Sequence, residues 1–332
     1  MNQNPQIAVV GGGSWGTALI KLLSNNTEKI HWWVRKKENA NHIKQYHRNP
    51  VYLSYMDLDT SKLIVSTSLK ETINNCDYII FAIPAAFLKP SLEKEGIDDL
   101  SGKTIISAIK GIIPVDNLVV SEYFRQKFKV PNINLGIIAG PCHSEEVAME
   151  KLSFLTLAFK DKQKASYLMQ QISSEYMKIS ITDDLIGAEY AAVLKNIIAI
   201  ANGICIGLGY GDNFQSVLIV NAIQEMRRFL DKINFIDRDI NNSVYLGDLV
   251  VTAYSKFSRN RTFGNMIGKG YSSKFAQIEM KMVAEGYYAV KCIYELNKQW
   301  DVHMPITDTV YNIIYNNKSP IKEIRSLAEK LN

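Results

Sequence analysis

Cysteine is scarce in this sequence, and no pair of cysteines has metal-binding spacing. The four cysteines, Cys76, Cys142, Cys205 and Cys292, are far apart in the chain and form no C-x-x-C pattern. This distribution excludes a disulfide framework and a cysteine-based zinc site, so we predict a reducing compartment. The first residues are polar, and the sequence shows no basic segment followed by an apolar stretch and a small-residue cleavage site. The sequence therefore predicts no signal peptide and a cytoplasmic location.

An uninterrupted apolar run that could span a membrane is also missing. The most apolar long stretch, 191–208, contains Lys195, Asn196 and Asn202, which favours a buried core helix over a membrane span. A strong charge imbalance is missing too, because 38 basic and 33 acidic residues leave a net charge of +5. A dispersed excess of this size predicts no nucleic-acid partner, since such partners need basic residues clustered on one face.

The composition present is that of a globular protein, with 47% apolar and 21% charged residues. At roughly 150 residues per domain, this length predicts about two domains. In the first half, short β-rich runs alternate with helical stretches, which is typical of a parallel sheet covered on both faces. We predict strands at 7–10, 30–34, 63–66, 78–83, 104–108, 135–139, 154–159 and 177–181, and helices at 14–23, 38–46, 69–75, 85–93 and 117–128.

After residue 184 the pattern becomes helical throughout. We predict helices at 187–207, 214–230, 242–254, 287–298, 307–315 and 321–331. The fold class expected is therefore a Rossmann-like, doubly wound α/β domain over 1–184, followed by an all-α domain over 185–332.

A glycine-rich turn follows the first predicted strand. Gly11, Gly13 and Gly16 fit G-x-G-x-x-G, directly after a strand and at the start of a helix. Glycine turns of this kind also occur without a ligand. The strand-turn-helix context nevertheless favours a dinucleotide site, in which backbone N–H groups approach the pyrophosphate.

The end of the second predicted strand bears on the choice between NAD and NADP. An NAD-selective site usually has an acid there, whereas this chain has Arg35, Lys36 and Lys37. Cations suit a 2′-phosphate, because a guanidinium makes bidentate, charge-assisted bonds to it. The alternative is a solvated cluster at a helix start. The pattern favours NADP without excluding NAD.

Two lysines occupy positions where a functional role competes with a structural one. Lys195 lies in an otherwise apolar helix, where burial would lower its pKa toward the range useful for acid–base chemistry; the alternative is a lysine that snorkels to the surface. Lys110 ends an apolar strand, where ligands of α/β sheets bind, although lysines at such ends are commonly just solvated.

Three further segments are ambiguous when taken singly. The turn 140–144 follows a strand end and offers either backbone N–H groups to an anion or simply a tight turn. The segment 258–261 places two arginines around an asparagine, which suits phosphate capture or a solvated basic loop. The glycines of 207–213 end a helix, so we interpret them as a helix-terminating loop and not a second nucleotide site.

Taken in order along the chain, these motifs resemble the NAD(P)-dependent glycerol-3-phosphate dehydrogenases, particularly the bacterial type. The resemblance extends from Gly11 to the segment 304–306. Its most specific parts are 13–19, 194–196, 207–213 and Arg259-Asn260-Arg261 after Gly247-Asp248.

The resemblance implies a reaction and its residues. Lys195 would accept the proton in glycerol 3-phosphate oxidation and protonate dihydroxyacetone phosphate in reverse, with Asp248 orienting or charge-balancing it. Lys110 would touch both substrate and cofactor. The other substrate contacts implied are Gly140, Cys142, Ser258, Arg259 and Asn260.

The cofactor implied is NADP or NAD. From the glycine motif, the cations after the second strand and the resemblance together, its predicted contacts are Gly11, Gly13, Ser14, Trp15, Gly16, Arg35, Lys36, Lys110, Ser144, Arg259, Val283 and Glu285. The resemblance also implies a homodimer and a role in supplying glycerol 3-phosphate for glycerophospholipids.

The chain departs from the family pattern at four places. Cys142 replaces the usual Ser or Thr, Ser144 replaces a common alanine, Ala284 replaces an acid, and 107–109 is a looser form of its segment. None of these changes removes the residues of the predicted chemistry, so we expect an active enzyme. Two other functions remain open from the sequence: a related β-hydroxyacid-type dehydrogenase with a catalytic lysine, and a non-catalytic NAD(P)-sensing protein.

Overall fold

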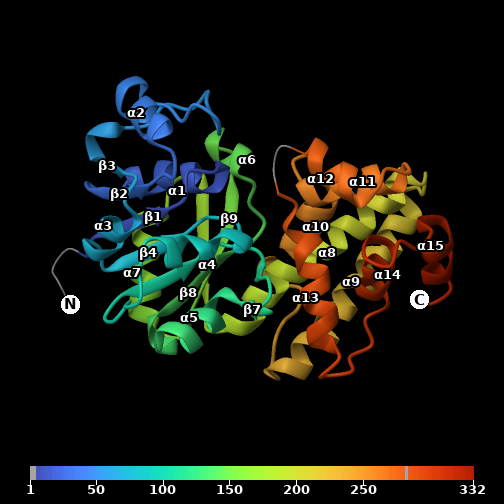
Figure 1. The fold of residues 1–332 in the computed structure, drawn as a ribbon. Coiled ribbons are helices and arrows are strands. Elements are labelled where there is room, and N and C mark those ends of the chain that lie inside the picture. The colour runs from blue at the N-terminus through green and yellow to red at the C-terminus, as the bar shows by residue number, and fades with distance from the viewer. Residues whose placement is uncertain (1–4, 281–282) are drawn as a thin grey trace. The chain divides into compact units, whose positions relative to one another are not determined.

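The computed structural model describes residues 5–280 and 283–332, and the chain forms two compact units (Figure 1). Unit 1 comprises the chain up to Ile109 together with Val120–Leu185. Unit 2 comprises Lys110–Val119 and Ile186–Asn332. The short segment that begins at Lys110 thus belongs with the C-terminal half, although its sequence lies within the N-terminal half.

Unit 1 is built on an eight-stranded sheet in the order β10-β9-β8-β5-β4-β1-β2-β3. All neighbouring strands are parallel except β8 and β9, which pair antiparallel. The strands are β1 (Ile7–Val10), β2 (Ile30–Trp33), β3 (Leu63–Ser66), β4 (Tyr78–Phe81), β5 (Thr104–Ser107), β8 (Leu135–Ala139), β9 (Ser153–Phe159) and β10 (Met177–Thr182).

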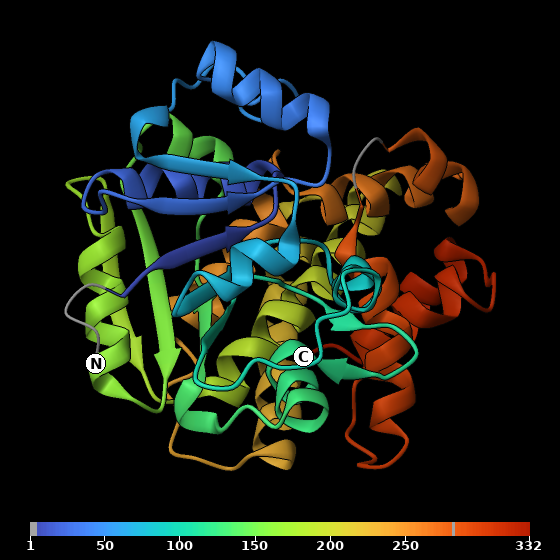
Figure 2. The same ribbon diagram turned by 60° about the vertical axis from the view of Figure 1, so that its left-hand side comes forward.

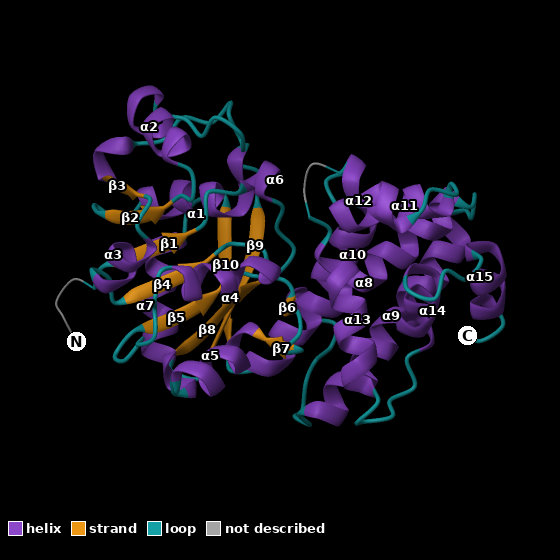
Figure 3. Ribbon diagram, viewed as in Figure 1, coloured by secondary structure: helices purple, strands orange, loops and turns teal. Residues whose placement is uncertain are grey.

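Helices cover both faces of this sheet (Figure 3). The helices of unit 1 are α1 (Ser14–Ser24), α2 (Lys37–Tyr46), α3 (Leu69–Asn74), α4 (Ala85–Lys94), α5 (Val120–Phe128), α6 (Ser144–Ala148) and α7 (Lys162–Ile172). Helix α1 packs on one face of the sheet, and the later helices α6 and α7 pack beside it and share its apolar cluster. The strand order reverses between β1 and β4, the position at which α/β sheets of this kind bind ligands.

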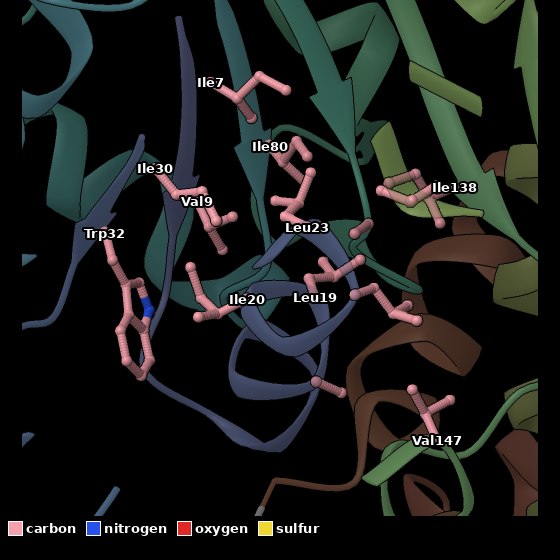
Figure 4. Close-up of a cluster of buried hydrophobic side chains, with 14 of the residues drawn as sticks. Ile7, Val9, Leu19, Ile20, Leu23, Ile30, Trp32, Ile80, Ile138 and Val147 are labelled. Carbon is pink, nitrogen blue, oxygen red and sulfur yellow. The ribbon is translucent and has the colours of Figure 1, made fainter. Parts of the chain in front are cut away.

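The core of unit 1 lies between α1 and the central strands (Figure 4). Leu19, Ile20 and Leu23 of α1 are fully buried against apolar side chains of the sheet, including Val9 and Ile80. Burying a side chain of this size contributes about 1.5–3 kcal/mol. This packing fixes α1, and with it the glycine turn that precedes the helix, on the sheet.

Unit 2 is helical apart from the short hairpin of β6 (Ile112–Ile113) and β7 (Leu118–Val119). Its longest helix, α8 (Leu185–Gly207), has mostly buried side chains, and the later helices of the unit run from yellow to red in Figure 2. These are α9 (Asp212–Ile233), α10 (Asp248–Tyr254), α11 (Arg259–Gly268), α12 (Ser273–Glu279), α13 (Glu285–Asn297), α14 (Pro305–Ile314) and α15 (Pro320–Ala328). By length and composition α8 is the one described helix that could cross a bilayer, but 83% of its most apolar window is buried.

The predicted fold class is confirmed, with corrections to individual elements. The strand pair β8–β9 is antiparallel, whereas an entirely parallel sheet was expected. The helix expected over 117–128 begins at Val120, because Asn117 adopts a left-handed φ of 53° and 118–119 form a strand. The helix expected over 242–254 opens with a π-helical turn, Ser243–Gly247. Helices α6, α7, α11 and α12 were not predicted.

Candidate active site

Two lysines share one buried carboxylate in unit 2. Lys195 of α8 donates a hydrogen bond to Oδ1 of Asp248, and Nζ of Lys110 lies 3.5 Å from Oδ2 of the same carboxylate. Lys195 is 3% exposed and Asp248 is 1% exposed. The two predicted catalytic residues and the predicted substrate lysine therefore lie together, although they come from positions far apart in the sequence.

Burial sets the protonation behaviour of Lys195. Removal from water favours the neutral amine and lowers the pKa of Lys195, and the positive charge of Lys110 acts in the same direction. The charge of Asp248 opposes both effects by stabilising the ammonium form. The balance brings the pKa of Lys195 to about 7, so this group exchanges a proton near neutral pH.

Side chains of α8 and α10 hold the backbones of Lys110 and Asp248 in place. Asn196, next to Lys195 on α8, donates from Nδ2 to the carbonyl oxygen of Lys110 at 2.7 Å. Asp248 is the first residue of α10, and Thr252 one turn later donates from its hydroxyl to the Asp248 carbonyl oxygen. Lys195 and Asp248 thus lie on helices, and the loop residue Lys110 is tied to α8 through Asn196.

The predicted phosphate-binding residues open α11 and are not in a loop. Ser258 caps this helix by accepting a hydrogen bond from the Arg261 N–H, so Arg259 and Asn260 lie in the first turn. Oδ1 of Asn260 accepts a hydrogen bond from the Gly286 N–H at 2.9 Å. Among the described residues nothing binds Nδ2 of Asn260, so its N–H groups are available to an anion.

Close helix packing fixes this first turn relative to Lys195. A Cβ on Gly264 of α11 would lie 2.1 Å from the Ile200 carbonyl oxygen of α8, and one on Gly203 would lie 2.2 Å from the Arg261 carbonyl oxygen. The two helix backbones therefore touch. Any larger side chain at these positions would push α11 away from α8.

The glycine turn in unit 1 has the geometry of a dinucleotide loop. Gly11 has a φ of +136°, and a Cβ on Gly16 would lie 2.1 Å from the Gly11 carbonyl oxygen. In contrast, a Cβ on Gly13 would meet nothing within 4 Å. Gly11 and Gly16 are thus needed for the turn itself, whereas Gly13 borders open space at the start of α1. The backbone at a helix N-terminus after such a turn is where the pyrophosphate of a dinucleotide typically binds.

Cations gather at the end of β2. The Arg35 guanidinium lies over the ring of Phe87 at 5.9 Å, and Lys36 and Lys37 form the N-terminus of α2. Lys36 makes no capping hydrogen bond with its side chain. Positive charge at a helix N-terminus opposes the helix dipole, so these residues do not stabilise α2.

The other predicted site residues fall into two groups. In unit 1, Trp15 packs beside the core at the start of α1, Gly140 has a φ of +119° after β8, Cys142 is buried, and Ser144 opens α6. In unit 2, Val283 precedes α13 and Glu285 is its first residue.

Sequence reasoning missed two residues of this region. Gly286 contacts Asn260 through its N–H, and a Cβ on it would lie 2.6 Å from the Asn196 carbonyl oxygen. The ring of Phe87 makes a cation–π contact with the Arg35 guanidinium. The sequence shows a glycine and a phenylalanine at these two positions, but only the fold identifies their partners.

Comparison with known proteins places this arrangement in context. The profile of the NAD-dependent glycerol-3-phosphate dehydrogenase N-terminus matches residues 6–165, and that of the C-terminus matches residues 184–325. The chain is 33% identical over 325 residues to glycerol-3-phosphate dehydrogenase [NAD(P)+] of Exiguobacterium, covering 98% of this chain and 95% of the relative. It is also 33% identical to the Staphylococcus aureus protein of the same name, covering 98% of each.

Solved structures agree with the fold. The crystal structure of glycerol-3-phosphate dehydrogenase from Coxiella burnetii superposes with a TM-score of 0.90 at 27% identity, covering 98% of this chain and 99% of that one. A Saccharomyces cerevisiae glycerol-3-phosphate dehydrogenase shares the fold at a TM-score of 0.83 and 24% identity, covering 98% of this chain and 99% of that one.

Proposed function

The chain belongs to the NAD-dependent glycerol-3-phosphate dehydrogenase family, and on that premise we propose that it interconverts glycerol 3-phosphate and dihydroxyacetone phosphate. The observation that carries the proposal is the buried Asp248 carboxylate with Lys195 and Lys110 on its two oxygens. This group can hold or release one proton near neutral pH, which is what reduction of a carbonyl and oxidation of an alcohol require.

The cofactor fits the open glycine turn of unit 1. We propose that Gly11, Gly13, Ser14, Trp15 and Gly16 hold its pyrophosphate end. Lys110, Ser144, Arg259, Val283 and Glu285 are further proposed contacts. When bound, NAD(P) supplies the hydride acceptor and NAD(P)H the hydride donor.

Lys195 moves the proton of the reaction. In the reductive direction its ammonium protonates the carbonyl oxygen, and in the oxidative direction its neutral amine accepts the hydroxyl proton. Asp248 stabilises the ammonium form and, by holding both lysines, keeps Nζ of Lys195 in a fixed position. Lys110 adds a second positive charge beside the oxygen on which negative charge develops.

Arg259 and Asn260 bind the phosphate of the substrate. Arg259 offers a guanidinium at the start of α11, and Asn260 offers the N–H groups of Nδ2 because Gly286 occupies Oδ1. Ser258, Gly140 and Cys142 are proposed to complete the substrate contacts. A cysteine at 142 offers only a weak S–H donor where a hydroxyl is usual.

Arg35 and Lys36 are proposed to select a 2′-phosphate, and hence NADP. Their position at the start of α2 supports this, since the helix dipole disfavours cations there and an anion would relieve the conflict. We expect kcat/KM for dihydroxyacetone phosphate reduction to be higher with NADPH than with NADH, measured side by side at steady state. A higher value with NADH would contradict the role given to Arg35 and Lys36.

The same assay tests the proposed reaction. Absence of turnover of dihydroxyacetone phosphate with either cofactor would overturn it. Turnover of a non-phosphorylated 3-hydroxy acid that survives Arg259→Ala would favour a different β-hydroxyacid-type dehydrogenase. Cofactor binding without oxidation or reduction of any of these substrates would favour an NAD(P)-sensing protein.

Two glycines of the cofactor turn are expected to respond differently to alanine. Gly16→Ala sets a methyl group against the Gly11 carbonyl oxygen, so we expect about 1–3 kcal/mol lower stability in chemical denaturation. Gly13→Ala keeps a backbone that alanine tolerates, with a φ of −80°, and meets no neighbouring atom. We expect it to leave stability unchanged and to raise the dissociation constant of the dinucleotide. Equal dinucleotide affinity in wild type and Gly13→Ala would contradict the site.

The remaining assignments rest on the resemblance to the family. We propose that residues 1–184 form the cofactor-binding domain and residues 185–332 the substrate-binding domain. Lys110 is proposed to act together with the residues of the substrate-binding domain. A homodimer, a cytoplasmic location and the supply of glycerol 3-phosphate for glycerophospholipids are proposed on the same basis.

A further inference from the structure

Asn49 lies beside the glycine turn, and both the nitrogen and the oxygen of its side-chain amide form hydrogen bonds. The residue follows α2, and it is 1% exposed. Its Nδ2 donates to the Gly12 carbonyl oxygen at 3.0 Å and to Oγ1 of Thr17 at 2.9 Å. Its Oδ1 accepts from the N–H groups of Val51 and Tyr52 at 3.0 and 3.1 Å. Asn49 therefore ties the segment after α2 to the turn between β1 and α1.

Three successive carbonyl groups of the turn are held in the same way. The indole Nε1 of Trp32 donates to the Gly11 carbonyl oxygen at 2.8 Å. Asn49 holds the carbonyl of Gly12, and the hydroxyl of Thr17 donates to that of Gly13 at 2.9 Å. Each of these carbonyls thus points toward the protein interior.

The orientation of these carbonyls determines the orientation of the N–H groups that follow them. In a trans peptide the carbonyl and the next N–H point in opposite directions, and no cis peptide occurs among the described residues. The N–H groups of Gly12, Gly13 and Ser14 therefore point away from Trp32, Asn49 and Thr17. Within residues 5–280 and 283–332 none of them donates to another residue. Consecutive N–H groups directed to one side form a concave anion site.

We infer that Asn49 is a positioning residue for the pyrophosphate of the cofactor, because it fixes the Gly12–Gly13 peptide with its N–H directed to the ligand. The inference rests on the proposed dinucleotide site. Asn49 itself does not touch the pyrophosphate: it acts through the Gly12 carbonyl. Trp32 has the same role one peptide earlier, through the Gly11 carbonyl.

Asn49→Asp separates this role from a general role in folding. The aspartate keeps an oxygen for the Val51 and Tyr52 N–H groups but sets a second oxygen against the Gly12 carbonyl, which disfavours the required peptide orientation. We expect the dissociation constant and KM of the dinucleotide to rise about tenfold or more, as for a lost hydrogen bond to a charged group. We expect kcat and the KM of dihydroxyacetone phosphate to stay unchanged at saturating dinucleotide.

Asn49→Asp also adds a negative charge, and a neutral second variant and a charged control separate the effect of that charge from the loss of the hydrogen bond. Trp32→Phe, which is neutral, removes the donor to Gly11 and should weaken dinucleotide binding in the same direction. Asn221→Asp changes a buried asparagine of α9 that donates to the carbonyl oxygens of Val217 and Asn332, and should leave dinucleotide affinity unchanged. Thermal unfolding without cofactor reports any loss of stability separately.

Competitive inhibition identifies the part of the cofactor concerned. We expect Asn49→Asp and Trp32→Phe to weaken inhibition by ADP, which carries a pyrophosphate, and to leave inhibition by adenosine unchanged. Wild-type affinity in both variants would overturn the inference, as would an equal loss for ADP and adenosine. A wild-type protein that binds no dinucleotide would overturn the proposed function itself, so the two failures are distinguishable.

Discussion

Replacing Lys195 by methionine is expected to lower kcat in both directions by about 10³-fold, within the range found for a lost general acid or base. Methionine has a similar length and fills the buried position, but it carries no proton. The hydroxyl proton of the alcohol would then have no acceptor, and the carbonyl oxygen of the ketone no donor. Binding of the dinucleotide, whose proposed contacts do not include Lys195, should be unchanged in a fluorescence titration.

An exposed lysine–carboxylate pair in the same unit provides the control. Lys298 of unit 2 lies 2.7 Å from Glu295, and its side chain is 57% exposed. Lys298→Met removes an ion pair of the kind that contributes little in water, so kcat should be unchanged. If Lys195→Met retained wild-type turnover, the proton-transfer role of Lys195 would be wrong.

The pH dependence of the wild-type enzyme follows from the lowered pKa of Lys195, which is about 7. Reduction needs the ammonium form, so its rate should fall as the pH rises through this value. Oxidation needs the neutral amine, so its rate should rise through the same range. Both trends should vanish in Lys195→Met, and a midpoint near the ordinary lysine value of about 10.4 would contradict the buried-lysine mechanism.

The fold was predictable because unit 1 follows strong local rules. Four-residue apolar strands, a glycine turn after the first of them and intervening helices specify a doubly wound sheet with little ambiguity. The antiparallel pairing of β8 with β9 was not predictable from these runs, since a buried strand has the same composition in either direction.

The catalytic cluster was predictable only in part. Lys195 stands out as a cation in an apolar helix, but its proximity to Asp248 and Lys110 depends on tertiary packing. The helix α11 was missed because two asparagines and two glycines weaken its local signal. Both glycines, Gly264 and Gly268, are in close contact with the backbone of α8, and the sequence of α11 alone does not reveal this contact.

Replacing Asp248 by asparagine should have the second largest effect. The carboxylate serves two lysines with two acceptor oxygens, whereas an amide has only one acceptor and directs N–H groups at the other lysine. Breaking a buried ion pair by removing one partner costs about 3 kcal/mol or more, so we expect kcat/KM for reduction at neutral pH to fall by about two orders of magnitude.

The pH profile of this variant separates an electrostatic role of Asp248 from a merely structural one. The carboxylate raises the pKa of Lys195 against burial and against the charge of Lys110. Without it, the pKa of Lys195 falls further, and the midpoint of the reduction profile should move to lower pH than in the wild type. Glu295→Gln, which removes the carboxylate of the exposed pair with Lys298, should leave both the rate and the midpoint unchanged. A slower Asp248→Asn enzyme with the wild-type midpoint would mean that Asp248 only holds the lysines in place and does not set the proton affinity of Lys195.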